Sequence, residues 1–190
     1  MIKLHLGCGW RNFGEDWVHI DGGNYPHVIS HNIINLPYED NSVDLIYSSH
    51  VIQYFDREEV VPVLKEWNRV LKPRGLLRIA VPDFEAITNL YVNGRFPLKN
   101  FLGLLYGKME MGMKGGETGK IIYHKTVYDF LSLREVLESV GFSDIRRYDW
   151  RTTPPHNKFD DQSQAYLPHM DKENGTLVSL NVEANKSQSR

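Results

Sequence analysis

The residues best suited to chemistry near the start of the chain form a glycine turn followed by an acid. Gly7 and Gly9 follow a strand-like run at residues 3–6, and Asp21 ends a second strand-like run at residues 17–20. Closely spaced glycines after a first strand let the backbone approach a ligand, which is how nucleotide sites are built. An acid at the end of the next strand suits the adenosine and amino-acid parts of a cofactor that has no pyrophosphate.

A dinucleotide site is the alternative with which this turn must be compared. Its fingerprint needs a third glycine at the sixth position of the motif, where Asn12 stands, and a helix that holds the pyrophosphate. Only eleven residues separate Gly9 from Asp21, which is too few for a full helix and a strand. The spacing therefore disfavours a nicotinamide dinucleotide, whereas an ordinary tight turn stays open as the simplest alternative.

A second concentration of acid-base side chains lies in the polar loop expected at residues 151–175. It carries His156, Asp160, Asp161 and His169. Because histidine has the reference pKa nearest to neutral pH, His169 and His156 are better candidates for a general base than the aspartates, which would bind acceptor hydroxyls or fix a histidine tautomer. Successive carboxylates point apart in an extended chain, so we expect no metal site here. A solvated polar loop is the alternative.

The glycine-rich stretch at residues 94–125 ends on a further candidate base, His124, which could meet an anionic acceptor. The stretch holds seven of the fifteen glycines and three of the five methionines. Flexible glycines and adaptable methionines are typical of a lid over a ligand, and an inert surface loop is the alternative. Cys8 has no identifiable partner base, so we expect a small packing residue. His5 and His19 lie within strands and are expected to be structural.

The composition is that of an ordinary globular domain. The 190 residues are 41% hydrophobic and 24% charged, and 24 acidic against 22 basic side chains leave a formal net charge of −2. This balance gives no reason to expect nucleic acid as a partner. No run approaches the ~18 apolar residues that a membrane span needs. With one cysteine and no signal-peptide pattern, we expect a cytoplasmic protein without a membrane partner.

Strands and helices alternate along the chain, and they must position these residues. Strands are predicted at residues 3–6, 17–20, 28–34, 43–47, 76–81, 143–150 and 176–183, and helices at 56–71, 84–92 and 128–140. The alternation predicts an α/β fold with a Rossmann-like, mostly parallel sheet and helices packed against it. The first two crossover helices are trimmed to loops, and no helical period joins the last two strands, which we expect to pair antiparallel.

This assignment also predicts where the middle helix begins and how the domain is divided. Asp56 and Glu59 resemble a capping box, and Pro62 implies that the middle helix starts late or kinks. A single domain at residues 1–184 would contain a lid-like insertion at 94–125 and an acceptor-side loop at 151–175. Residues 185–190 are predicted to be a flexible tail.

Six segments, taken together, resemble a known family because of the order in which they occur. They lie at residues 6–9 (LGCG), 19–21 (HID), 32–38 (NIINLPY), 40–47 (DNSVDLIY), 49–55 (SHVIQYF) and 66–75 (EWNRVLKPRG). In this order they resemble the class I S-adenosylmethionine-dependent methyltransferases, specifically the methyltransferase type 11 group and its short variants often found among sugar and surface-glycan genes. The resemblance covers residues 4–83 well and residues 126–150 weakly.

This resemblance implies a cofactor, S-adenosyl-L-methionine, and a site for it. Gly7 and Gly9 would cradle its methionine part, and Asp21 would accept hydrogen bonds from its ribose hydroxyls. Asn32 stands where the family usually has an aspartate facing the adenine amino group, and an asparagine carbonyl can accept the same bond. The end of the fourth strand would lie next to the sulfonium. The implied cofactor-binding residues are Leu6, Gly7, Cys8, Gly9, Asp21, Asn32, Ile33, Ser49 and His50.

The resemblance also implies methyl transfer to a small-molecule acceptor, such as a sugar, a sugar nucleotide or a phosphorylated metabolite of surface-glycan biosynthesis. The catalytic candidates are His169, His156, His124 and Asp161. Gln53 and Tyr54 stand where the family commonly has Glu-His, and a cofactor-binding sensor or partner subunit without turnover is the alternative function. Because the first crossovers are trimmed, one side of the cofactor would be open or covered by another segment. Homodimerisation is one way to cover it.

Overall fold

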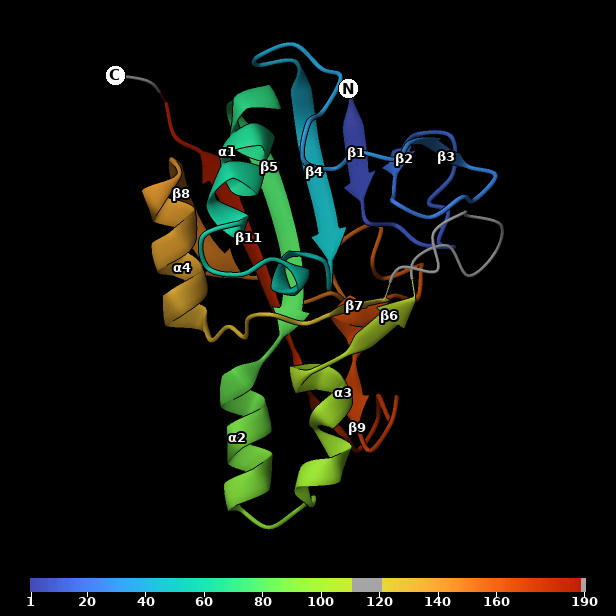
Figure 1. Cartoon of the computed structure of the whole chain (residues 1–190), viewed down its shortest axis with the longest axis vertical. Coiled ribbons are helices and arrows are strands. Elements are labelled where there is room, and N and C mark those ends of the chain that lie inside the picture. Colours follow the sequence, from blue (N-terminus) through green and yellow to red (C-terminus); the bar gives the residue numbers. More distant parts are fainter. Residues whose placement is uncertain (111–120, 189–190) are drawn as a thin grey trace.

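A computed structural model describes residues 1–110 and 121–188, and within these residues seven strands form one sheet (Figure 1). They are β1 (Lys3–Leu6), β2 (Val18–Ile20), β3 (Val28–Ser30), β4 (Val43–Ser49), β5 (Leu71–Pro82), β8 (Phe142–Arg147) and β11 (Ser179–Lys186). The order is β3-β2-β1-β4-β5-β11-β8. β11 runs antiparallel to both β5 and β8, and the other neighbours are parallel. This arrangement confirms the predicted α/β class and the antiparallel C-terminal strand.

Outside this sheet, the described residues form helices and short strands, which are η1 (Ile52–Tyr54), α1 (Val60–Val70), α2 (Phe84–Val92), η2 (Leu98–Asn100), α3 (Leu102–Leu105), β6 (Lys108–Glu110), β7 (Ile121–Tyr123), α4 (Phe130–Ser139), η3 (Gln162–Gln164), β9 (Tyr166–Leu167) and β10 (Thr176–Leu177). Helices α1 and α4 pack on one face of the sheet, and α2, α3 and the β6–β7 pair lie beyond the carboxyl end of β5 (Figure 1). The predicted lid at 94–125 thus contains α3 and the β6–β7 hairpin, while its residues 111–120 lie outside the described residues. Its role as a lid stays a prediction. Among the described residues, no helix is long and apolar enough to span a membrane.

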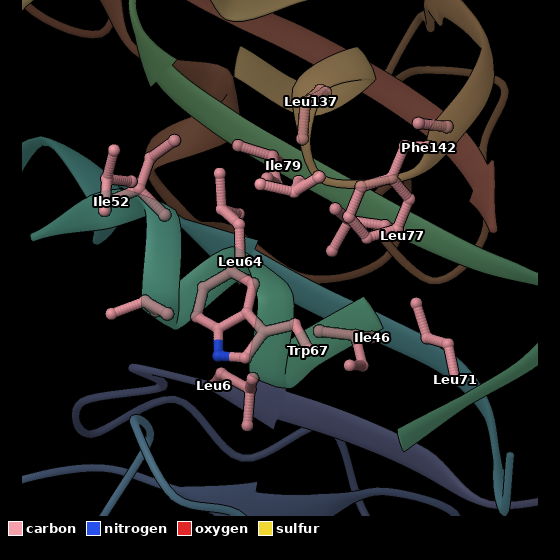
Figure 2. Packing of buried hydrophobic residues seen from close by; sticks show 14 of the residues in the cluster. Leu6, Ile46, Ile52, Leu64, Trp67, Leu71, Leu77, Ile79, Leu137 and Phe142 are labelled. Carbon is pink, nitrogen blue, oxygen red and sulfur yellow. The ribbon is translucent and has the colours of Figure 1, made fainter. Parts of the chain in front are cut away.

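The main hydrophobic core lies between one face of the sheet and the helices α1 and α4 (Figure 2). Trp67 of α1 is fully buried among side chains of neighbouring strands, including Leu6 and Ile46. Helix α1 starts at Val60, late as Pro62 implied. Asp56 and Glu59 form the expected reciprocal cap, because each side chain accepts a hydrogen bond from the backbone N–H of the other.

Several element boundaries differ from the predicted ones, among them those of β5, β3 and β11. Strand β5 begins at Leu71 rather than at residue 76, because the β4–β5 register jumps by several residues and residues 72–75 bulge out of the ladder. Strand β3 ends at Ser30, and the rest of the predicted strand is a loop. Strand β11 continues to Lys186, two residues into the predicted tail, because Lys186 pairs with Phe142 of β8 and its Nζ atom donates to the backbone oxygen of Leu71.

The second face of the sheet carries polar and aromatic side chains and is covered by loops. The connections at residues 7–17 and 21–27, all of which the structure describes, contain no helix, as the trimmed crossovers predict. In place of helices, residues 148–165, which we name the covering segment, lie against this face. Phe159 stacks on Phe13 at a ring distance of 4.9 Å, and the Pro154 carbonyl accepts a hydrogen bond from Arg78. A segment of the same chain therefore covers the face of the sheet that the trimmed crossovers leave without helices.

Asp161 ties the covering segment to the sheet. Its carboxylate accepts hydrogen bonds from the Tyr47 hydroxyl at 2.7 Å and from the backbone N–H of Ser163 at 2.7 Å. Burial alone raises the pKa of Asp161, but the interactions with His156, Ser163 and Tyr47 oppose this and lower the pKa to about 2. The side chain is 2% exposed and carries its negative charge inside the protein.

We predict that Asp161→Ala lowers the free energy of unfolding by about 2–4 kcal/mol, because the Tyr47 hydroxyl and the Ser163 amide lose their buried partner. Asp160→Ala is the matched control. Asp160 is adjacent, largely exposed and paired only with Lys172 at 3.1 Å, so its loss should cost less than about 0.5 kcal/mol. Urea unfolding followed by circular dichroism measures both values. An equal decrease in the free energy of unfolding in the two variants would show that Asp161 does not stabilise the covering segment as proposed.

A second prediction concerns pH, because two buried histidines lie in the layer under the covering segment. Burial lowers the pKa of His5 to about 3 and that of His19 to about 4. The unfolded chain therefore binds more protons than the folded one below about pH 6.5, and stability is full above that pH and falls on acidification towards pH 4. Each histidine should contribute a slope of about 1.4 kcal/mol per pH unit in this window.

The variant His5→Phe tests the assignment of this slope. The ring stacks on Phe13 at 4.2 Å, and its Nδ1 atom has no hydrogen-bond partner among the described residues, so a phenyl ring can replace it. Denaturation midpoints measured from pH 7.5 to pH 4.5 should fall less steeply in the variant. A wild-type midpoint that does not change over this range would refute the prediction.

Candidate functional site

The glycine turn brings the backbone of β1 against the end of β4. Gly7 has a φ of +69°, and its N–H donates to the Ile20 carbonyl at 2.8 Å. A Cβ atom built on Gly7 would overlap Cγ2 of Val51, so only glycine fits here. Gly9 also has a positive φ, +56°, but a Cβ atom there would meet no atom within 4 Å. The turn is therefore tight on its β4 side and open at Gly9.

Asp21 holds the two ends of this turn region together. Its Oδ2 atom accepts a hydrogen bond from the Gly9 N–H at 2.8 Å, and its Oδ1 atom accepts one from the Gly23 N–H at 2.6 Å. A carboxylate has about four lone-pair positions, so each oxygen can accept one further hydrogen bond. Asp21 is partly exposed at the carboxyl end of β2, where the sheet of an α/β protein binds ligands.

Cys8 lies inside the turn and is a packing residue, as expected. Its side chain is 1% exposed, and Sγ lies 3.7 Å from the His27 Nε2 atom. Burial, followed by the charge of Asp21, raises the pKa of the thiol to about 12. The thiol therefore stays protonated at neutral pH, which excludes a nucleophilic role.

The loop that holds Asn32 and Ile33 is fastened by helix α1. Trp67 donates from Nε1 to the Ile33 carbonyl at 2.8 Å, and Glu66 accepts from the Leu36 N–H at 2.8 Å. The Asn32 Oδ1 atom accepts from the N–H groups of residues 34 and 35, so both of its lone pairs serve the turn. The Asn32 carbonyl oxygen is therefore not free to accept the expected hydrogen bond from the adenine amino group. A role for Asn32 at adenine stays a prediction and would need its side-chain NH₂ group as the donor.

The end of β4 places Ser49 and His50 next to the glycine turn. Val51, the neighbour of His50, is the residue that packs on Gly7. The His50 N–H donates to the Ala80 carbonyl at 2.8 Å, and its Nε2 atom lies 3.1 Å from the Ser179 hydroxyl. His50 has a φ of +53°, a left-handed conformation that is uncommon outside glycine.

Two of the four predicted catalytic residues lie under the sheet and not at its carboxyl edge. His156 is 0% exposed, its ring lies 4.1 Å from the tilted ring of Tyr47, and its Nδ1 atom is 3.7 Å from Asp161. The loop after β8 was expected to stay on the ligand side, but it turns beneath the polar face. His156 and Asp161 therefore come together as a buried structural pair, and the expectation that His156 meets the acceptor is corrected by its burial.

His124 lies near the carboxyl end of β4 but is held on both ring nitrogens. Nδ1 is 2.9 Å from the Leu104 carbonyl, and Nε2 is 3.4 Å from the Gln53 amide nitrogen. Since a carbonyl only accepts, Nδ1 carries the proton and Nε2 faces the amide donor. Burial lowers the pKa of His124, partly offset by the Leu104 bond. A Cβ atom on Gly107 would come within 2.7 Å of Nε2, so this edge of the ring is covered.

His169 stands apart from the other candidates. It is exposed in the loop between β9 and β10, and within the described part of the chain it makes no hydrogen bond or ring contact with His50, His124 or His156. Its predicted role as a base stays a prediction that no contact supports.

Sequence reasoning missed Ser179 and Asn181. Both are 3% exposed and lie on the polar face of β11, where they alternate with apolar Val178, Leu180 and Val182. The alternation was visible in the sequence, but it reads equally well as a strand with one solvent-exposed face. Only the sheet order, which puts β11 between two other strands, shows that these polar groups are buried.

Each of the comparisons with known proteins finds methyltransferases. Residues 4–79 match the family described as a methyltransferase domain. Demethylmenaquinone methyltransferase of Staphylococcus haemolyticus is 26% identical over 132 residues, which make up 65% of this chain and 50% of that protein. The chain thus spans half the length of this curated relative.

Solved structures share the fold over nearly the whole chain. A SAM-dependent methyltransferase of Thermotoga maritima has a TM-score of 0.58 at 15% identity, over 98% of this chain and 82% of that one. The 1,6-didemethyltoxoflavin-N1-methyltransferase of Burkholderia thailandensis, solved with S-adenosylhomocysteine, has a TM-score of 0.54 at 12% identity, over 98% and 71%. The family match thus runs from β1 into β5, and the likeness to the solved methyltransferases is one of fold.

Proposed function

We propose that this chain binds S-adenosylmethionine and transfers its methyl group to a small-molecule acceptor. The observation that carries the proposal is the Asp21 carboxylate, which binds the N–H groups of Gly9 and Gly23 and keeps an acceptor site on each oxygen. Two such sites on one carboxylate suit the two adjacent hydroxyls of a ribose.

The glycine turn fits the other end of such a cofactor. The open space at Gly9 admits a ligand against the backbone, and Val51 on the other side of Gly7 closes the turn. When bound, the cofactor supplies a methyl group on a sulfonium, which passes to the acceptor as the bond to sulfur breaks. The residues of this chain would align the two reactants, which is the main contribution that a displacement of this kind requires.

The acceptor that we propose is a sugar, a sugar nucleotide or a phosphorylated metabolite. Support comes from the resemblance to short methyltransferase variants found among sugar and surface-glycan genes. A cytoplasmic location is proposed with it, on the basis of the single, unpaired Cys8. Because the covering segment closes the second face, the trimmed crossovers supply no argument for a homodimer.

Isothermal titration calorimetry with S-adenosylmethionine and S-adenosylhomocysteine tests the proposal directly. Wild-type protein should bind both, and Asp21→Ala should weaken binding by about 1–3 kcal/mol because the ribose hydroxyls lose a charged partner. Asp16→Ala, at an exposed aspartate outside the turn, serves as the control and should bind as the wild type does. No binding to the wild type at millimolar ligand would reject the function. Binding without methylation of any hydroxylated acceptor would favour the sensor alternative.

The open space at Gly9 gives a separate prediction. Gly9→Ala and Gly14→Ala introduce the same methyl group at positive φ and in open space, so each should cost about 1–2 kcal/mol of stability. Only Gly9→Ala should also lose cofactor affinity, because its Cβ atom would occupy the space assigned to the ligand. Calorimetry after checking both folds by circular dichroism measures this difference. Equal affinities would place the cofactor elsewhere.

A further inference from the structure

His50 is held in a backbone conformation that its sequence does not favour. A φ of +53° is unfavourable for a residue other than glycine. The surrounding contacts maintain it, because the His50 N–H donates to the Ala80 carbonyl of β5 at 2.8 Å. Strained backbone conformations are found most often at functional sites, where they fix the orientation of a side chain. His50 is such a residue, and it directly follows the carboxyl end of β4.

This end of β4 is in direct contact with the proposed cofactor turn. Val51 follows His50 and packs so closely on Gly7 that no Cβ atom fits between them. His50 itself is partly exposed, and the charges of His124, Asp161 and Arg11 influence its pKa. The histidine therefore lies beside the glycine turn and within electrostatic range of His124 and of Asp161 in the covering segment.

Hydrogen bonds determine which ring nitrogen of His50 carries the proton. The Asn181 amide NH₂ group donates to the Ser163 carbonyl at 2.8 Å, which leaves the Asn181 carbonyl to accept from the Ser179 hydroxyl at 3.0 Å. The Ser179 hydroxyl has then used its only proton, so it can only accept from His50 Nε2 at 3.1 Å. Nε2 is therefore protonated and Nδ1 carries a lone pair.

The Nδ1 atom of His50 makes no hydrogen bond to any residue in the described part of the chain. His124 is bound by the Leu104 carbonyl and faces the Gln53 amide, and His156 is buried beneath the sheet. The Nδ1 atom of His31 lies 3.0 Å from the Asp21 carbonyl oxygen, which places this histidine at the end of β2. His50, in contrast, follows β4 directly and is the neighbour of Val51, which packs on Gly7.

We propose that His50 is the general base of the reaction and takes the proton of an acceptor hydroxyl on Nδ1, with Ser179 and Asn181 as positioning residues. The proposal rests on the function proposed above. The acceptor oxygen forms its bond to the methyl carbon as the bond from carbon to sulfur breaks, and the positively charged sulfonium becomes a neutral thioether. The acceptor proton goes to Nδ1, and the resulting imidazolium returns it to water after the product leaves.

The electrostatics of the site determine the resting protonation state of His50. Burial lowers the pKa of His50 to about 3, with His124 and Arg11 lowering it further and Asp161 opposing them. Nδ1 is thus unprotonated at neutral pH and available as an acceptor. Because it is a weak base, it takes the proton only as the bond to the methyl carbon forms and the hydroxyl becomes acidic.

The first test is nitrogen NMR of histidine-labelled protein, which reads the tautomer without any acceptor. At pH 7.5 His50, identified by the signals lost in His50→Asn, should show a protonated Nε2 and an unprotonated Nδ1. Ser179→Ala should give a mixture of tautomers, and Ser179→Thr, which keeps the hydroxyl, should restore the wild-type pattern. A tautomer protonated on Nδ1, or no change in Ser179→Ala, would overturn the assignment.

A pair of cofactor analogues then tests where Nδ1 points. Sinefungin carries an amine in place of the sulfonium methyl group, whereas S-adenosylhomocysteine has nothing there. The amine should shift the His50 Nδ1 resonance and S-adenosylhomocysteine should not. Equal effects of the two ligands would mean that Nδ1 does not face the methyl position. If neither ligand binds, the proposed function fails, which is a different result from a failure of the role of His50.

Turnover supplies the third readout, measured as S-adenosylhomocysteine release with a panel of hydroxylated acceptors. His50→Asn, in which asparagine tolerates the left-handed backbone, should lower kcat by about 10²-fold or more while the affinity for S-adenosylhomocysteine changes little. Arg74→Asn places the same residue at another left-handed position, which is exposed in the amino-terminal part of β5, and should keep the wild-type rate. A His50→Asn protein with wild-type kcat would reject the proposal.

Discussion

The polar face of the sheet must be buried by loops, and much of the structure depends on how its hydrogen-bonding groups find partners there. Tyr47 and Asn181 lie on strands β4 and β11, and their partners Asp161 and Ser163 both come from the covering segment. A buried hydroxyl or amide without a partner costs about 1–3 kcal/mol, so the segment cannot be replaced by an arbitrary apolar loop. The trimmed crossovers are tolerated because the covering segment buries the face of the sheet that crossover helices would otherwise cover.

The same contacts extend to the site. The Ser163 carbonyl orients Asn181, Asn181 orients the Ser179 hydroxyl, and that hydroxyl determines the tautomer of His50. A loop that covers the sheet thereby sets the protonation of a side chain at the carboxyl edge. The opposite face makes a comparable connection, because Glu66 and Trp67 of α1 bind the loop at residues 33–36. Both layers thus hold the segments around the glycine turn in place.

Much of this arrangement could be predicted because it depends on residues close together in the sequence. The glycine turn, the acid at Asp21 and the cap formed by Asp56 and Glu59 each need only a few neighbouring residues, and all three are found where expected. The alternation of strands and helices was sufficient to predict the α/β class. The period of the apolar residues distinguishes a strand, which buries one face, from a helix, which buries one stripe. Element ends were less certain, since a register shift such as that at the start of β5 has no local signal.

By itself, then, the sequence determined the class of fold and the place of the glycine turn, whereas only the tertiary structure decided which histidines are buried and which hydrogen bonds they make. Histidine types and spacing favoured His169 and His156, but exposure and the tautomer are set by residues far along the chain. The Tyr47–Asp161 bond spans 114 positions and the His50–Ser179 bond spans 129. Hydrogen bonds at such separations exist only after the sheet order is established, and no local pattern encodes them.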